Sequence, residues 1–398
     1  MNEGRSGMKQ QLKYVLAVAL FIACAGFLFG SFSAPVAAAE PPIKIGIVMP
    51  ITGPGGFMGT PMKEAAVAIF EGINARGGIN GRKVEYIIED DQSKPTQAVV
   101  AATKLIRDEK VCAIIAASLA DSDAAMIPTV EQEQIPMLVS GPLVAPYKKW
   151  VFHLGPGDER GAAHIMDFVV NQMGAKKIGL MRDTAVYGSE GSKFYNIYAK
   201  KYPGVSIIID EKMEMTDTNV IPQLTKIKAA KPDVMIIHSL ISGPVAKNYK
   251  QLGMTTPVFG SHAMPSPQFL AQGGAVAEES KWVMTGSKLL IGDKVPANDS
   301  FRKNIYEPFK KMLKDKYGPT KDVNVFHPAI HDGCMVAIEG LKLAGTDNRA
   351  ALRDAIEKVK FEGMVGNYAC NPGDHQCCPK DTMPEMMVKG GEFVPYSK

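Results

Sequence analysis

The segment VEYIIEDDQSKPTQAVVAATKLIRDEKVCAIIAASLADSD, residues 84–123, decides the fold of this chain. It begins with a short run rich in β-branched and aromatic residues, continues through a helical pattern opened by Pro95, and returns to a second apolar run, VCAII. Proline in the first turn is typical of a helix start. Two apolar strands flanking one helix predict a right-handed βαβ unit with parallel strands covered on both faces.

The same alternation extends in both directions along the chain. A strand is predicted at 43–50 and a helix at 60–78, and a further strand follows at 135–140. The pattern then restarts and repeats over 159–261, so we expect an α/β protein with two doubly wound parallel-sheet lobes joined by a hinge. Residues 298–359 have helical patterns, and a strand-rich tail follows.

Lobe boundaries are predicted from the glycine-rich segment VFHLGPGDERG and from a later return crossing. Residues 1–39 are assigned to a signal peptide. The first lobe is predicted to comprise residues 40–157 and 288–375. The second lobe is predicted to comprise residues 158–287 and 376–398.

The N-terminus has the pattern of an export signal. Lys9 and Lys13 precede an apolar run at 14–32, and small residues of A-x-A type follow. This order predicts a secretory signal peptide cleaved after Ala39, and therefore a periplasmic protein. An uncleaved membrane anchor is one alternative, because the run is nearly long enough to span a bilayer. A lipid anchor at Cys24 is another.

Composition and charge narrow the class of partner. The chain is 46% hydrophobic and 22% charged, with a formal net charge of +4. These values are ordinary for a globular protein. No long basic block appears, so nucleic acid is not expected as a partner.

Three of the six cysteines cluster near the C-terminus, in NYACNPGDHQCCPKD. The turn signal NPGD lies between Cys370 and the pair Cys377 and Cys378. In an oxidising compartment this arrangement favours a disulfide from Cys370 to one of the two. The alternative is a metal site that also uses His375, but the spacing matches no common zinc pattern.

The loops that follow the predicted strands are rich in glycine, serine and proline and poor in catalytic groups. Ligands of open parallel sheets bind at these carboxyl ends. No phosphate-binding loop and no G-x-S-x-G elbow occurs. His327 and His331 lack the glutamate of a metalloprotease motif, and Pro328 between them is predicted to mark a helix start. We therefore expect a binding protein without a cofactor or metal, not an enzyme.

Three blocks of the chain resemble the periplasmic leucine/isoleucine/valine-binding proteins. They are IKIGIVMPITGPGGFMG at 43–59, the long block EGINARGGINGRKVEYIIEDDQSKPTQAVVAATKLI at 71–106, and YGSEG at 187–191. The resemblance covers nearly the whole chain after Ile43. It implies a type I solute-binding receptor of a branched-chain-amino-acid-type ABC importer, with the ligand between two lobes.

The resemblance also implies a cradle for a ligand carboxylate, formed by Ser118, Leu119 and Ala120. The physics is compatible, because a helix N-terminus offers unpaired N–H donors and partial positive charge. Asp121 or Ser122 is expected to cap the helix, which would leave the donors near Ser118 free.

Several positions depart from the family pattern. Val144 stands where the resemblance implies a threonine, and Pro142 in the same loop lacks an N–H. His262 stands where amino-acid-binding members carry an acid for the substrate ammonium. Tyr187 retains the family aromatic and is expected to reach across the cleft from the second lobe.

Other candidates complete the predicted site. Met58, with Phe57 and Phe326, is expected to form an apolar wall, and Leu240 stands nearest to a lost aromatic. Asp158 is the one nearby acid available for an ammonium group. A neutral imidazole cannot replace a carboxylate, so we expect a small carboxylate or amide-like solute in preference to a standard α-amino acid.

Two functions are compatible with these features. The first is a monomeric transport receptor that closes its lobes on a small solute and docks on the membrane permease of an ABC importer. The second is a ligand-sensing subunit of a signalling or chemotaxis receptor with the same fold. Both would use the same cleft.

Overall fold

The computed structural model describes residues 40–141, 148–155, 157–370, 372–373, 375–378 and 383–397, except the side chain of Asp158. The chain divides into Met1–Pro41 and a second unit, Pro42–Lys398, to which all elements below belong. Among the described residues, no helix combines the length and apolarity that crossing a bilayer requires.

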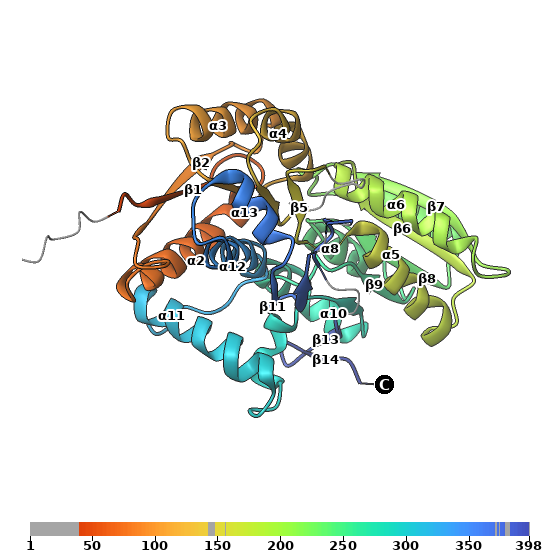
Figure 1. Ribbon diagram of the computed structural model, residues 1–398. Helices are drawn as coiled ribbons and strands as arrows, with labels where there is room; N and C mark the ends of the chain where they lie inside the picture. The colour runs from red at the N-terminus through yellow and green to blue at the C-terminus, as the bar shows by residue number, and fades with distance from the viewer. Residues whose placement is uncertain are drawn as a thin grey trace, which may run out of the picture. The chain divides into compact units, whose positions relative to one another are not determined.

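The first sheet has five parallel strands in the order β2-β1-β3-β4-β5 (Figure 1). Its strands are β1 (Ile43–Met49), β2 (Val84–Asp90), β3 (Ala113–Ala116), β4 (Met137–Val139) and β5 (Val151–His153). The βαβ unit predicted around Pro95 is therefore confirmed. The segment VFH, assigned to the linker region, forms the edge strand β5 of this sheet before the chain crosses to the second lobe.

Helices cover both faces of the first sheet, as Figure 1 shows for α3 and α4 on one side and α2 and α12 on the other. The helices of this lobe are α2 (Gly56–Ala75), α3 (Pro95–Arg107), α4 (Ala120–Gln132), α11 (Glu307–Tyr317), α12 (His327–Ala344) and α13 (Arg349–Ile356). Alternate residues of β1 point to opposite faces. Ile45 and Ile47 belong to the core with α2 and α12, whereas Val48 packs with α3 and α4.

The second sheet has the order β14-β13-β10-β9-β8-β6-β7. Its strands are β6 (Lys177–Asp183), β7 (Ser206–Met213), β8 (Val234–His238), β9 (Val258–Gly260), β10 (Val283–Thr285), β13 (Glu385–Lys389) and β14 (Glu392–Pro395). The strands β6 to β10 pair in parallel, as predicted. The tail departs from that pattern, because β13 and β14 add an antiparallel hairpin at the edge.

Helices also cover the second sheet. They are α5 (Asp158–Asp167), η1 (Phe168–Gln172), α6 (Val186–Ala199), α7 (Ile221–Ala230), α8 (Gly243–Gln251), α9 (Pro267–Phe269), η2 (Leu270–Gly274) and α10 (Ala275–Glu279). After β10 the chain forms η3 (Lys288–Lys294) and η4 (Arg302–Tyr306), and the hairpin β11 (Lys360–Glu362) with β12 (Asn367–Ala369) packs on the first core.

A disulfide joins Cys370 to Cys377, which decides between the two pairings that the spacing allowed. Residues 375–377, at the end of the loop that the bridge closes, run beside β5, where the backbone N–H of His153 donates to the carbonyl of His375 at 2.8 Å. The N–H of Cys377 in turn donates to the carbonyl of His153 at 2.9 Å. The C-terminal segment is thereby held against β5 at the start of the crossing.

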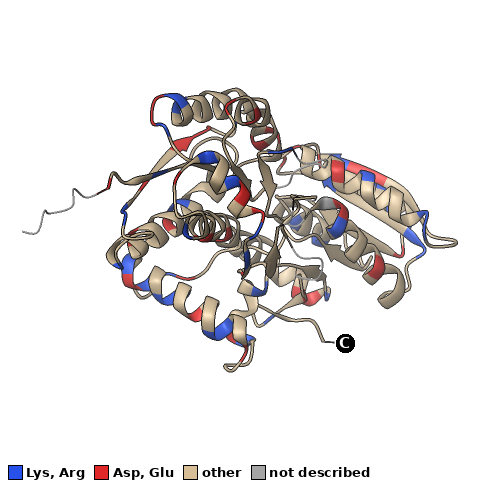
Figure 2. Ribbon diagram, in the orientation of Figure 1, with Lys and Arg blue, Asp and Glu red and all other residues tan. Residues whose placement is uncertain are grey.

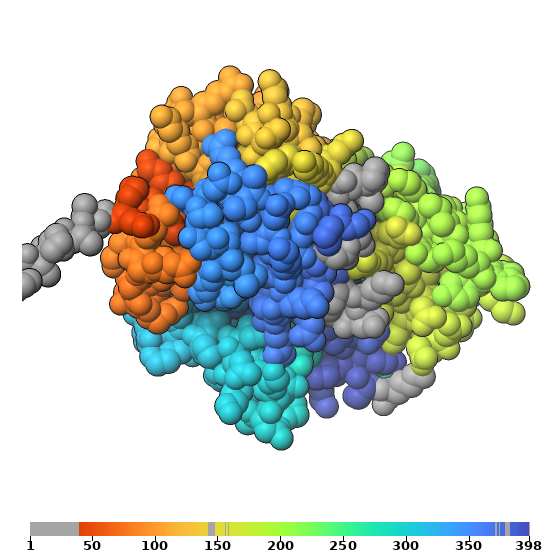
Figure 3. Space-filling model, viewed as in Figure 1, coloured from red at the N-terminus to blue at the C-terminus, as the bar shows by residue number. Residues whose placement is uncertain are grey.

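Charged side chains of both signs occur along α11, where lysines predominate, as Figure 2 shows. On the face in Figure 3, the chain around residues 330–370 lies against the N-terminal part of the first lobe. The contacts of α12 with α2 account for that position.

Candidate ligand-binding site

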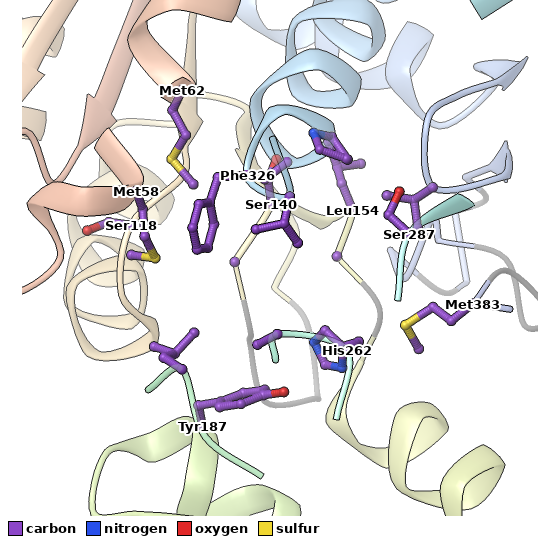
Figure 4. A pocket seen from close by; sticks show the side chains of 18 of the residues that line it. Met58, Met62, Ser118, Ser140, Leu154, Tyr187, His262, Ser287, Phe326 and Met383 are labelled. Carbon is purple, nitrogen blue, oxygen red and sulfur yellow. The ribbon is translucent and has the colours of Figure 1, made fainter. Parts of the chain in front are cut away.

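A cavity of about 140 Å³ lies where the two sheets present the carboxyl ends of their strands (Figure 4). Its described lining residues are Met58, Met62, Ser118, Ser140, Gly141, Leu154, Gly155, Tyr187, Leu240, His262, Ala263, Ser287, Val325, Phe326, Pro328, Ala329, Val365, Tyr368 and Met383. Such a position at strand ends is where ligands of doubly wound sheets bind.

The first sheet contributes the residues that directly follow its strands. Ser118 follows β3, Ser140 and Gly141 follow β4, and Leu154 and Gly155 follow β5. Because these strands are parallel, their carboxyl ends meet at one edge of the sheet. Residues far apart in the sequence are thereby brought to one wall of the cavity.

The second sheet forms the facing wall in the same way. Tyr187 follows β6 in the first turn of α6, and Leu240 follows β8. His262 follows β9, and Ser287 follows β10. The site is therefore built from both lobes, and a ligand that fills it would contact both.

Helices and one hairpin close the remaining sides with apolar groups. Met58 and Met62 lie one turn apart on α2, and both line the cavity. Phe326, just before α12, meets the Phe57 ring edge-on with centroids 5.5 Å apart. Helix α12 begins at His327 with Pro328 in its first turn, which confirms the predicted helix start. Phe57 supports the wall, whereas Met58 and Phe326 line it.

The side chain of Tyr187 is held by neighbours in its own lobe. Its hydroxyl donates to the Ser261 hydroxyl at 3.0 Å, and the centroid of its ring lies 4.0 Å from that of the His238 ring. The imidazole of His238 is bonded to the Tyr195 hydroxyl at 2.8 Å. A Cβ at Gly191 would stand 2.5 Å from that imidazole, so this position needs glycine. Tyr187 is therefore rigidly placed at the cavity.

The imidazole of His262 meets the Tyr187 ring edge-on, with centroids 5.4 Å apart. Its Nδ1 is buried and has no hydrogen-bond partner among the described residues. Burial lowers the pKa of His262 to about 4. The ring is therefore neutral at pH 7, with one nitrogen a donor and the other an acceptor.

None of the described lining residues is an acid, a lysine or an arginine. An α-ammonium group would therefore find no counter-ion among them. Two predicted contacts, Pro142 and Val144, lie outside the described residues. Asp158 begins α5, and its side chain also lies outside the described part of the chain.

At the end of β3, the protein itself engages the donors of Ser118, one of the three residues of the expected anion cradle. The Asp123 carboxylate accepts the backbone N–H of Ser118 at 3.2 Å and 3.4 Å, and the Ser118 hydroxyl donates to Asp91. The expectation of free donors in this loop is therefore wrong for Ser118. Leu119 is the N-cap of α4 and Ala120 its first residue, and neither lines the cavity.

The expected capping residues also differ from those observed. Leu119 caps α4 through its backbone, and neither Asp121 nor Ser122 makes a side-chain cap. Asp121 is exposed, whereas Asp123 turns inward and is fully buried. An acid in the first helical turn is favourable beside unpaired N–H groups. That preference explains why the inward acid reaches back to Ser118.

Two buried acids thus adjoin the cavity without lining it. Burial raises the pKa of Asp123 well above its ordinary value, and the nearby charge of Asp91 adds to this. Burial also raises the pKa of Asp91. Neither Asp91 nor Asp123 was predicted at the site from the sequence. The available signal was the acid pair ending β2 together with the second aspartate of the loop after β3.

Comparisons with known proteins give a consistent result. The family model for a periplasmic binding protein matches residues 42–392. Leu/Ile/Val-binding protein homolog 3 of Brucella melitensis is 26% identical over 81% of this chain and 89% of its own length. An extracellular ligand-binding receptor from Rhodopseudomonas palustris HaA2 superposes with a TM-score of 0.81 at 27% identity, over 90% of this chain and all of its own.

A third similar structure was solved with a ligand. The solute binding protein of an ABC transporter from Rhodopseudomonas palustris BisB5, in complex with 3,4-dihydroxybenzoic acid, superposes with a TM-score of 0.74. It is 20% identical and covers 89% of this chain and 96% of its own, so this likeness concerns the fold.

Proposed function

The chain belongs to the leucine/isoleucine/valine-binding type of the periplasmic binding protein family, and from that premise we propose that it is the extracytoplasmic solute receptor of an ABC importer. Members of this family are solute-binding proteins, not enzymes. In the proposed role, the protein takes up a small solute and presents it to a membrane permease.

The observation that carries the proposal is the cavity shared by both sheets. Ser118 and Ser140 reach it from the first lobe, and Tyr187 and His262 from the second. A solute that contacts both walls has higher affinity for the closed arrangement and so favours closure. The closed state is what a permease could distinguish from the empty receptor.

The lining chemistry supports a largely apolar solute without an α-ammonium group. Met58, Met62 and Phe326 offer apolar contact, as ligand pockets commonly do. The neutral His262 supplies a hydrogen bond where an acid would be needed for an ammonium. An aromatic or branched solute with one polar head group, a carboxylic or amide compound, meets these requirements better than leucine.

A thermal-shift screen of the purified, oxidised protein tests this proposal. The panel contains leucine, valine and phenylalanine, their deaminated acids and amides, and benzoates including 3,4-dihydroxybenzoate. A ligand at a hundredfold excess over its Kd stabilises the native state by about 2.7 kcal/mol. We expect at least one compound without an ammonium group to raise Tm by several degrees, and the amino acids to leave it unchanged.

A cavity-filling variant identifies the site in the same screen. Ala329 lines the cavity from α12, and Ala329→Phe should abolish every specific shift. The matched control is Ala351→Phe on α13, outside the cavity lining. Stabilisation by leucine but not by its deaminated acid would contradict the proposed solute class. Shifts that persist in Ala329→Phe would place binding elsewhere.

A further inference from the structure

At the end of β3, an internal carboxylate meets the backbone N–H of a cavity-lining residue, as Asp183 also does at the end of β8, where it accepts the N–H of Leu240 at 3.1 Å. Asp123 accepts the Ser118 N–H with both carboxylate oxygens, at 3.2 Å and 3.4 Å. The hydroxyl of Ser118 donates to Asp91, so it presents no hydrogen to a ligand. Both donors that Ser118 could offer an anion are thus engaged.

The carboxylate of Asp123 also fills the space directly behind the cavity wall. A Cβ placed on Gly141 would stand 2.7 Å from Asp123 Oδ2 and 2.8 Å from the Ser118 carbonyl. Gly141 and Ser118 both line the cavity. An external carboxylate could not reach the Ser118 N–H without displacing Asp123, and it would approach two acids of the same sign.

The polar atoms that remain at the cavity are neutral. The Ser140 hydroxyl is buried, and it has no hydrogen-bond partner among the described residues. The Nδ1 atom of His262 is likewise buried and has no hydrogen-bond partner among the described residues. The Ser287 hydroxyl accepts the N–H of Leu289 at 3.2 Å, which leaves its hydrogen for another acceptor. These groups suit a carbonyl or an amide better than a full negative charge.

We propose that Asp123 occupies the anion-binding position at the end of β3, and so makes the cavity selective for uncharged solutes with an amide or hydroxyl head group. This selectivity rests on the proposed function, whereas the occupation of the anion position by Asp123 does not. Asp123 acts as a specificity-determining residue without touching the solute.

Both ionisation states of Asp123 produce the same selectivity. An ionised carboxylate repels a ligand anion and holds the Ser118 N–H. A protonated carboxyl still fills the space beside Gly141 and still accepts that N–H. Burial raises its pKa, which changes the balance of the two states but not the occupancy.

Chemical rescue with small anions tests the occupancy without knowledge of the natural solute. The probes are formate and acetate, with formamide, acetamide and equal ionic strength of chloride as references. They are added to the wild type, Asp123→Ala and Asp123→Asn. The alanine variant vacates the position, whereas asparagine fills it with an isosteric neutral group that can still accept the Ser118 N–H.

We expect formate or acetate to raise the Tm of Asp123→Ala. This rise should exceed any rise in the wild type or in Asp123→Asn at the same concentration. Anion affinity in Asp123→Ala should exceed that of the wild type by at least tenfold. An equal rise in the wild type would show that the cradle is open, and would overturn the proposal. Absence of any excess rise in Asp123→Ala would overturn it as well.

A second variant covers the case in which Asp123→Ala does not fold. Asp123→Ser has a side chain too short to place an acceptor where the carboxylate oxygens lie, and it should show the same rescue. In the solute screen, amides should stabilise the wild type more than the matching carboxylates. If carboxylates stabilise it more, the selectivity fails while the receptor role stands. If no compound of the solute panel raises the Tm of the wild type, but anions raise that of Asp123→Ala, the occupation of the anion position by Asp123 stands.

Discussion

Burial of imidazole rings makes individual histidines sensitive to acid. Burial lowers the pKa of His153 and His262 to about 4, and that of His327 to about 3. In the unfolded chain a histidine titrates near 6.5. Between the two values the unfolded state binds the proton and the folded state does not, so the free energy of unfolding falls as pH falls.

His153 gives a measurable case of this linkage. Its Nε2 is 2.8 Å from the Gly141 carbonyl, and its side chain is fully buried. The wild type should lose stability from pH 6.5 down to about 4, with about 3 kcal/mol from this residue. His153→Gln should be less stable than the wild type at pH 7, but its free energy of unfolding should change less with pH over that range. Urea unfolding at several pH values measures both, and an unchanged slope would contradict the assignment.

Buried acids oppose this trend and must be included in the comparison. Burial raises the pKa of Asp91, Asp123 and Asp183. Between the unfolded pKa and the raised value the folded state binds more protons, so these groups add stability as pH falls. The difference in pH dependence between the wild type and His153→Gln isolates the contribution of the histidine, because both proteins contain the acids.

At the scale of elements, the C-terminal segment depends on its disulfide for its place beside β5. The bridge between Cys370 and Cys377 closes a short loop, and His153 pairs with Gln376 within it. Closing a loop of this size restricts the unfolded chain by about 2.5 kcal/mol. The same segment adjoins Leu154 and Gly155 of the cavity wall, because the Gln376 amide donates to the Gly155 carbonyl at 3.1 Å.

Removal of the bridge should therefore affect stability and binding together. The Cys370→Ser/Cys377→Ser variant should lose about 2 to 3 kcal/mol in urea unfolding. It should also bind any solute identified in the screen more weakly. Cys378→Ser retains the bridge and serves as the control. Equal losses in the two variants would indicate that thiol burial, not the crosslink, stabilises this segment.

At the scale of the whole molecule, the cavity is shared by the two lobes. Its walls come from the ends of β3, β4 and β5 on one side and of β6, β8, β9 and β10 on the other. Because a solute between them gains contacts with both, the bound state should be the more closed one. Small-angle scattering should show a smaller radius of gyration on saturation with a solute from the screen.

The cavity-filling variant provides the control for closure. Ala329→Phe should show no change in radius of gyration with the same solute. An unchanged radius in the saturated wild type would contradict hinge closure while leaving binding itself intact. Binding measured by thermal shift separates the two outcomes.

The sequence by itself determined the alternation of strands and helices, the two parallel sheets and the family. Apolar periodicity is a local property, and a strand such as β3 must be buried wherever the chain places it. The family resemblance also pointed to Ser118, Tyr187 and His262, and Met58 was expected in an apolar wall; all four line the cavity.

Only the tertiary structure decided how those residues are used. Asp91 follows β2 and Asp123 lies in the first turn of α4, and their approach to Ser118 depends on the pairing of β2, β1 and β3. The choice of Cys377 over Cys378 and the antiparallel edge at β13 were likewise decided by packing. A side chain's partner across the fold depends on distances between segments, which local patterns do not encode.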